Sequence, residues 1–136
     1  MIRNTFYTLF LLLLFFPLFS QEIVNLPNLS EVNQEQDVSV GQLFGDSLST
    51  SFFIIVKDTV PTHKHQFHSE VVYVISGEGI IYLNDEYQKV QAGDVVFIPK
   101  NTWHAVKIKG ENPLEVLSVQ SPGFDGSDRV FLKNKK

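Results

Sequence analysis

The sequence predicts an all-β protein built as one antiparallel sandwich or barrel. Short runs of Val, Ile, Phe and Tyr recur after residue 20, separated by Gly, Pro, Asn and Asp. No useful length of this region repeats apolar residues at the three-four spacing of a helix. The breaks between runs, such as GEG (77–79) and AGD (92–94), are short. Short breaks favour antiparallel neighbours, because parallel strands need long crossovers, and many evenly spaced strands are typical of a sandwich or closed barrel.

The expected elements follow in chain order. VNLPNLS (24–30) and VSVGQLF (38–44) can supply edge strands. Six segments are rich in β-branched and aromatic residues and are bounded by turn formers, which predicts strands at 51–58, 70–77, 79–85, 94–99, 104–109 and 114–121. EYQKVQA (86–92) is a weaker seventh. The last segment, about residues 121–136, loses the alternation, and we expect a surface tail.

The first twenty residues have the pattern of a secretory signal. Arg3 precedes an apolar run at 9–19, and a small residue, Ser20, ends the segment. This predicts a signal peptide at 1–20, cleavage within a residue or two of Ser20, and an exported protein, periplasmic or secreted. An uncleaved membrane anchor is the alternative, although the run is short and contains Pro17. After cleavage we expect no membrane span, and residues 21–136 form one domain.

Composition excludes several classes of function. Without Arg3, the remaining ten Lys and Arg face fifteen Asp and Glu, which gives a net charge of −5. This acidic balance argues against a nucleic-acid partner, because such partners need a basic face. The chain has no cysteine, which excludes disulfides, zinc-thiolate sites and cysteine nucleophiles.

Three of the four histidines lie within PTHKHQFHSE (61–70). Side chains alternate faces along a strand, so His63 and His65 point the same way and can hold one cation. Glu70 opens the next strand and can reach the same ion, and His104 is a fourth candidate from far along the chain. Nitrogen and oxygen ligands suit divalent first-row metals, and binding should weaken as the pH falls toward 6.5. The alternative is that these histidines are surface residues or hydrogen-bonded core residues, which is the interpretation we keep for His68.

The histidine segment resembles the first motif of the cupin superfamily, G-x5-H-x-H-x(3,4)-E-x6-G. HKHQFHSEVVYVISG supplies His63, His65, Glu70 and Gly77 at that spacing. GDVVFIPKNTWH resembles the second motif, G-x5-P-x-G-x2-H-x3-N, and supplies Gly93, Pro99 and His104. The two motifs span residues 63–104. Three positions depart from the pattern, none of them a metal position: Lys57, Asn101 and Ile108. Asn101 tolerates a left-handed turn, so that departure is mild.

The resemblance implies a single-domain jelly-roll β-barrel with one metal inside, held by His63, His65, Glu70 and His104. The metal is iron, manganese, nickel, zinc or copper, and the ligand set does not choose among them. The resemblance also implies a small-molecule ligand in the barrel and a homodimer formed through edge strands. Bulky groups are expected at the mouth, with these candidates: Phe53, Tyr73, Tyr82, Phe97 and Trp103.

Three functions stay open. The first is a metal-dependent enzyme, of the oxygenase, isomerase or lyase type, acting on a small organic acid, a sugar or an aromatic compound. The second is a non-catalytic module that binds a sugar or an acid, and the third is a purely structural metal. No catalytic residue is identified; Glu70, His68 and Tyr73 are weak candidates. In the tail, Asp125, Asp128 and Arg129 are expected to pair at the surface, and Arg129 could instead reach a substrate carboxylate.

Overall fold

The computed structural model describes residues 22–26, 36–124 and 126–132. These residues contain ten strands: β1 (Val38–Gly45), β2 (Thr50–Val56), β3 (Thr59–His65), β4 (Ser69–Ser76), β5 (Glu78–Leu83), β6 (Glu86–Gln91), β7 (Val95–Ile98), β8 (His104–Ile108), β9 (Leu114–Ser121) and β10 (Arg129–Phe131). In this part of the chain no helix is long and apolar enough to cross a membrane.

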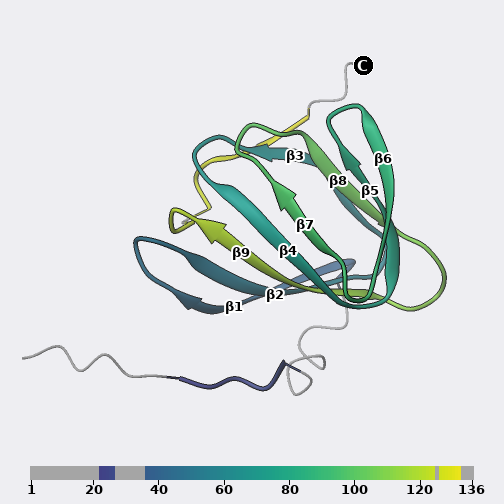
Figure 1. The fold of residues 1–136 in the computed structure, drawn as a ribbon, viewed down its shortest axis with the longest axis horizontal. Coiled ribbons are helices and arrows are strands. Elements are labelled where there is room, and N and C mark those ends of the chain that lie inside the picture. The colour runs from purple at the N-terminus through teal and green to yellow at the C-terminus, as the bar shows by residue number, and fades with distance from the viewer. Residues whose placement is uncertain (1–21, 27–35, 125, 133–136) are drawn as a thin grey trace, which may run out of the picture.

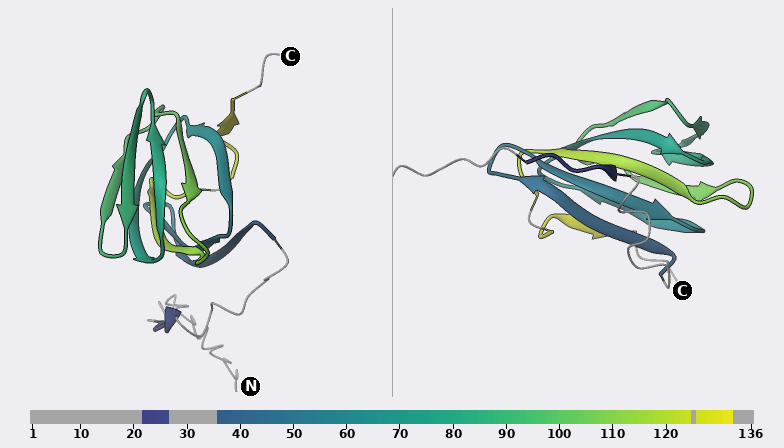
Figure 2. Two further views of the ribbon diagram at one scale, coloured as in Figure 1. Left: turned by 90° about the vertical axis from the view of Figure 1, so that its right-hand side faces the viewer. Right: turned by 90° about the horizontal axis from the view of Figure 1, so that it is seen from below.

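The strands form two five-stranded sheets that face each other (Figure 1). One sheet has the order β1-β2-β9-β4-β7 and the other β10-β3-β8-β5-β6, and every pair is antiparallel. Figure 2 shows the two layers from the side, with the C-terminal strand beside β3. The predicted all-β antiparallel jelly roll is confirmed.

The segments predicted as strands at 38–44, 51–58, 70–77, 79–85, 86–92, 94–99, 104–109 and 114–121 all form strands, within a few residues at each end. Two strands had no predicted run of their own. β3 is polar and contains Pro61, and β10 has only three residues, so neither carries a hydrophobic alternation. The predicted signal at 1–20 and most of the predicted edge strand at 24–30 lie outside the described residues.

Two turns depend on a backbone that most residues avoid. Asn101 has a φ of 65°, so the expected left-handed conformation is confirmed, and its backbone N–H donates to the carbonyl of His65 at 2.6 Å. Gly77 has a φ of 81°, and a Cβ there would lie 2.2 Å from the carbonyl oxygen of Pro113. Glycine is therefore required where β4 passes into β5.

The hydrophobic core lies between the two sheets. Strand alternation turns one face of β2, β4, β7 and β9 inward, and these inward residues are mostly Val, Ile and Leu. Val56, Val74 and Leu114 are each at most 2% exposed. Burying one such side chain stabilises a fold by about 1.5–3 kcal/mol. This aliphatic packing fixes the separation of the two sheets and so positions the groups between them.

Candidate metal centre

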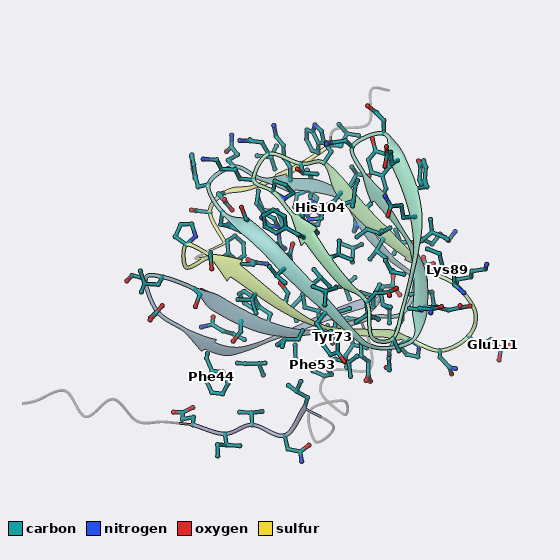
Figure 3. The ribbon with its side chains drawn as sticks, in the orientation of Figure 1. Phe44, Phe53, Tyr73, Lys89, His104 and Glu111 are labelled. Atoms are coloured by element: carbon teal, nitrogen blue, oxygen red, sulfur yellow. The ribbon has the colours of Figure 1, made fainter. Side chains whose placement is uncertain are left out.

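Three imidazoles meet inside the barrel. His63 and His65 point inward from β3, and His104 begins the adjacent strand β8 in register with His63. The centroid of the His63 ring lies 4.2 Å from that of His104 and 5.1 Å from that of His65. The three residues each offer a nitrogen within 4.8 Å of the others, and all three are buried. Figure 3 shows His104 between the two sheets.

Backbone carbonyls fix the orientation of two of these rings. Nδ1 of His63 lies 2.8 Å from the carbonyl oxygen of Pro61, and Nδ1 of His104 lies 2.9 Å from that of Thr102. A carbonyl only accepts, so Nδ1 carries the hydrogen in both residues. Nε2 is then the unprotonated nitrogen, and it is available as a metal ligand.

Glu70 approaches the imidazoles from the opposite sheet. Its Oε2 lies 3.5 Å from Nε2 of His104 and 3.7 Å from Nε2 of His65. Its other oxygen, Oε1, accepts hydrogen bonds from the hydroxyl of Ser118 and, at 3.3 Å, from the side-chain amide of Gln120. Both donors lie on β9, next to β4, and both are buried. They hold the carboxylate with Oε2 toward the histidines.

The residues fit a divalent cation. Nε2 of His65 and Nε2 of His104 are buried without a hydrogen-bond partner among the described residues. Buried polar atoms are normally paired, so two orphaned nitrogens facing one carboxylate oxygen indicate that a ligand belongs between them. Imidazole nitrogens and a carboxylate suit first-row divalent metals. The structure thus brings all four predicted ligands together at one place.

Burial shifts the protonation of these groups. Burial, helped by the neighbouring imidazoles, lowers the pKa of His63 and of His65 to about 4, although Glu70 partly offsets this for His65. Burial acts to raise the pKa of Glu70, but His104, the Ser118 hydroxyl and His65 outweigh it, and the pKa falls to about 2. At neutral pH His63 and His65 are therefore neutral and Glu70 is ionised, which are the states that bind metals.

The site opens on a cavity of about 370 Å³ between the sheets. Its polar lining residues are His63, His65, Glu70, His104, Gln120 and Arg129. The rest of the lining is aliphatic except for Phe131 on β10. Val40 and Phe131 are each more than half exposed, which places the opening between β1 and β10.

The five aromatic residues named as candidates for the mouth are the wrong ones, because the aromatic that lies there is Phe131. The cavity lining contains none of the five candidates Phe53, Tyr73, Tyr82, Phe97 and Trp103. The neighbours Ile54, Val72 and Val96 line the cavity, and alternation along β2, β4 and β7 turns three of these aromatics to the outer face. Trp103 packs under the ammonium of Lys64, and Tyr82 packs on Tyr87. Valine and isoleucine side chains line the space between the sheets instead.

The weak catalytic candidates have different positions. Tyr73 is on the outer face of β4 and is 43% exposed, so its hydroxyl has no route to the cavity. His68 is buried behind His65 with ring centroids 4.1 Å apart, and it is outside the cavity lining. Glu70 alone of the three faces the cavity.

The surface pairing expected for Asp128 is wrong. Asp128 is 4% exposed and lies beside two histidines, with Oδ2 3.0 Å from Nδ1 of His68 and Oδ1 3.5 Å from Nδ1 of His65. The guanidinium of Arg129 instead lies over the ring of Phe124 at 5.3 Å. Asp125 lies outside the described residues.

Sequence reasoning also missed the two groups that hold Glu70. Leu114, Val116, Ser118 and Gln120 alternate along β9 and all face inward. The first two are apolar, and the last two are polar. A polar residue at an inward position of an apolar alternation is the signal that could have found them.

Comparison with known proteins agrees with this architecture. The model of the family described as "Cupin domain" matches residues 52–120. An uncharacterized protein of Aquifex aeolicus is 30% identical over 111 residues, which cover 78% of this chain and 91% of that protein. An uncharacterized protein, MJ1618, of Methanocaldococcus jannaschii is 32% identical over 71 residues, 52% of this chain and 57% of that protein. An oxalate-binding protein of Thermotoga maritima is 34% identical over 61 residues, 45% of this chain and 50% of that protein.

The chain thus spans about half the length of two of these three relatives. Among solved structures, a Klebsiella pneumoniae protein with a double-stranded β-helix domain aligns at a TM-score of 0.73 with 16% identity, over 85% of this chain and all of that one. A Streptomyces PAC13 variant with uridine aligns at a TM-score of 0.60 with 26% identity, over 71% of this chain and 77% of that one. From its family match and its Aquifex relative, this chain belongs to the cupin family.

Proposed function

We propose that this protein is a metal-dependent enzyme that acts on a small organic acid with an apolar body. The observation that carries the proposal is the convergence of three imidazoles and Glu70 on one wall of a cavity whose remaining lining is almost wholly aliphatic. His63, His65, Glu70 and His104 would hold one divalent transition metal, which when bound supplies a Lewis acid, or a redox centre if it is iron.

The remaining groups of the chain act on the ligand. Arg129 lines the cavity near its exposed end and offers a guanidinium that pairs with a carboxylate in a bidentate manner. Gln120 lines the same cavity and has a buried Oε1 without a hydrogen-bond partner among the described residues. That oxygen can accept a hydrogen bond from a hydroxyl or a protonated group of the ligand.

The lining favours an acid over a sugar. A sugar presents hydroxyls on most of its carbons, and each would lose its hydrogen bonds to water against Val, Ile and Leu. A ligand with one anionic group and an aliphatic or aromatic body avoids that penalty. The volume of about 370 Å³ is at the small end of ligand pockets, which span about 300–1,000 Å³, so the body must be compact.

The relatives support both an enzyme and a binding protein. One solved neighbour, Pac13, is described as a unique nucleoside dehydratase, which is a precedent for catalysis in this fold. The Thermotoga relative is named an oxalate-binding protein, and oxalate is an acid. The alternative function is therefore binding of an acid without turnover.

Metal binding is tested first, on chelator-treated protein titrated with Fe²⁺, Mn²⁺, Ni²⁺, Zn²⁺ and Cu²⁺ in turn. We expect one tight equivalent for at least one metal, and loss of that binding in His104→Gln. The matched control is Lys107→Gln, which changes an exposed side chain of the same strand, outside the cavity, and should retain binding. Equal loss in both variants would contradict this ligand set.

The ligand class is tested on the metal-loaded protein with short branched or aromatic monocarboxylates and with hexoses. We expect the acids to raise the melting temperature, the hexoses to have no effect, and Arg129→Gln to weaken the acids. Turnover of a stabilising acid supports an enzyme, and stabilisation without turnover supports the binding alternative. A metal that stabilises while none of the compounds binds would leave only a structural role.

Export and dimer formation are separate proposals. We infer export from the signal pattern at residues 1–20 and a homodimer from the family resemblance. N-terminal sequencing of protein recovered outside the cytoplasm tests cleavage near Ser20. Light scattering after gel filtration tests the dimer, and a mass near 15.5 kDa or below would refute it.

A further inference from the structure

We infer that Asp128 is a positioning residue for the metal centre: its carboxylate accepts the Nδ1 hydrogen of His65 and thereby directs Nε2 of that imidazole toward the ion. The inference rests on the proposed metal function of the site. It assigns a role to the C-terminal segment, in which strand β10 pairs directly with the strand that carries His63 and His65.

Each of the three ligand histidines has an acceptor facing its Nδ1, and for His65 that acceptor is Asp128. Nδ1 of His63 and Nδ1 of His104 each face a backbone carbonyl, whereas Nδ1 of His65 faces Oδ1 of Asp128 at 3.5 Å. That separation is longer than a normal hydrogen bond. Both atoms are nevertheless buried and have no other hydrogen-bond partner among the described residues. A buried donor and a buried acceptor that face each other satisfy each other after a small rotation of the imidazole.

The carboxylate itself is held in place. Its Oδ2 accepts the backbone N–H of Phe67 at 2.7 Å and lies 3.0 Å from Nδ1 of His68. The backbone carbonyl of Asp128 accepts the N–H of Gln66 at 3.3 Å. Three contacts therefore fix Asp128 against the turn that follows β3, and Oδ1 remains for His65.

A carboxylate that accepts the Nδ1 hydrogen strengthens the imidazole as a metal ligand more than a backbone carbonyl does. An imidazole that donates to a carboxylate is a more basic ligand through its other nitrogen, and loss of such a partner typically lowers metal affinity by about 10–100-fold. His65 is the ligand without a backbone acceptor, so its ring orientation depends on Asp128. Phe124 packs edge-on against the same ring at 5.4 Å and limits its rotation from the other side.

The tautomer of His65 can be read in the wild-type protein without any substitution. Long-range ¹⁵N–¹H correlation spectra of the metal-free protein at pH 7.5 distinguish a protonated Nδ1 from a protonated Nε2. We expect His65 to carry its hydrogen on Nδ1. A hydrogen on Nε2 overturns the inference, and this result is independent of whether any metal binds.

Metal affinity tests the consequence. We expect Asp128→Ala to weaken binding of the metal preferred by the wild type by about 10–100-fold, and Asp128→Asn, which retains an acceptor without the charge, to weaken it less. The matched control is Asp94→Ala, which removes a carboxylate that accepts a backbone N–H, from Gln91 at 2.8 Å, away from the histidines. We expect that variant to bind as the wild type does.

Three results would overturn the inference. The first is an affinity of Asp128→Ala within twofold of the wild type. The second is an equal loss in His68→Gln, which would mean that Asp128 only anchors the turn through His68. The third is two metal equivalents in the wild type and one in Asp128→Ala, which would make Asp128 a ligand of a second ion with His65 and His68. A wild type that binds no metal instead refutes the proposed function, and the tautomer of His65 then decides this inference alone.

Discussion

The metal-free protein should lose stability as the pH falls from 7.5 to 5.0, because two buried imidazoles resist protonation. The pKa of His63 and that of His65 are about 4 in the folded chain, against 6.5 for an ordinary histidine. Between these values the unfolded chain binds protons that the folded chain does not, so stability falls with pH. Each histidine contributes about 2 kcal/mol over this interval.

The two histidines together amount to about 4 kcal/mol, a large part of the roughly 5–15 kcal/mol that stabilises a typical domain. Urea unfolding in the presence of a chelator, followed by the fluorescence of the single tryptophan, Trp103, measures the loss. The double variant His63→Gln/His65→Gln removes both titrating groups, so most of the pH dependence should disappear. Equal unfolding free energies of the wild type at the two pH values would refute the reasoning, as would an undiminished loss in the double variant.

Three further predictions follow from single contacts. Ser118→Ala should lower the unfolding free energy by about 1–3 kcal/mol in a urea titration, because Oε1 of the buried Glu70 loses its hydroxyl donor. Val116→Phe should fill part of the cavity, so calorimetry should show weaker acid binding and unchanged metal affinity. Gly77→Ala should lower the melting temperature, with a cost of about 1–3 kcal/mol, because its φ of 81° and the adjacent carbonyl leave no room for a Cβ; an unchanged melting temperature would contradict that turn geometry.

Much of the fold and the centre of the site could be predicted because both depend on strand alternation. The inward direction of His63 and His65 follows from their spacing of two, and the register of β3 with β8 brings His104 beside them. His63 and His65 stay neutral to a lower pH than an ordinary histidine does, because both are buried. That burial was not visible in the sequence. The spacing along a strand determines which residues share a face, but it does not say how deeply the side chains on that face are buried.

The errors have a different physical origin. Alternation does not say which of two faces is the inner one, and two packed sheets are only about 10 Å apart. That space favours valine and isoleucine, so Phe53, Tyr73 and Phe97 lie on the opposite face of their strands. The buried position of Asp128 was missed because β10 is three residues long and pairs with a strand more than sixty residues earlier in the chain. Neither a hydrophobic pattern nor a local spacing marks such a pairing.

The hydrophobic core and the wall of the cavity are the same surface. All seven members of the buried core cluster line the cavity: Val56, Val74, Ile81, Val90, Ile98, Leu114 and Val116. Side chains beside empty space lose the dispersion contacts that atoms on the far side would supply. An apolar ligand body restores those contacts, so binding and core packing are coupled in this barrel. A substitution that enlarges a lining residue should therefore add packing contacts in the empty barrel and reduce the space left for the ligand. The stability of the empty barrel and the size of the molecule that it accepts are thus expected to change in opposite directions.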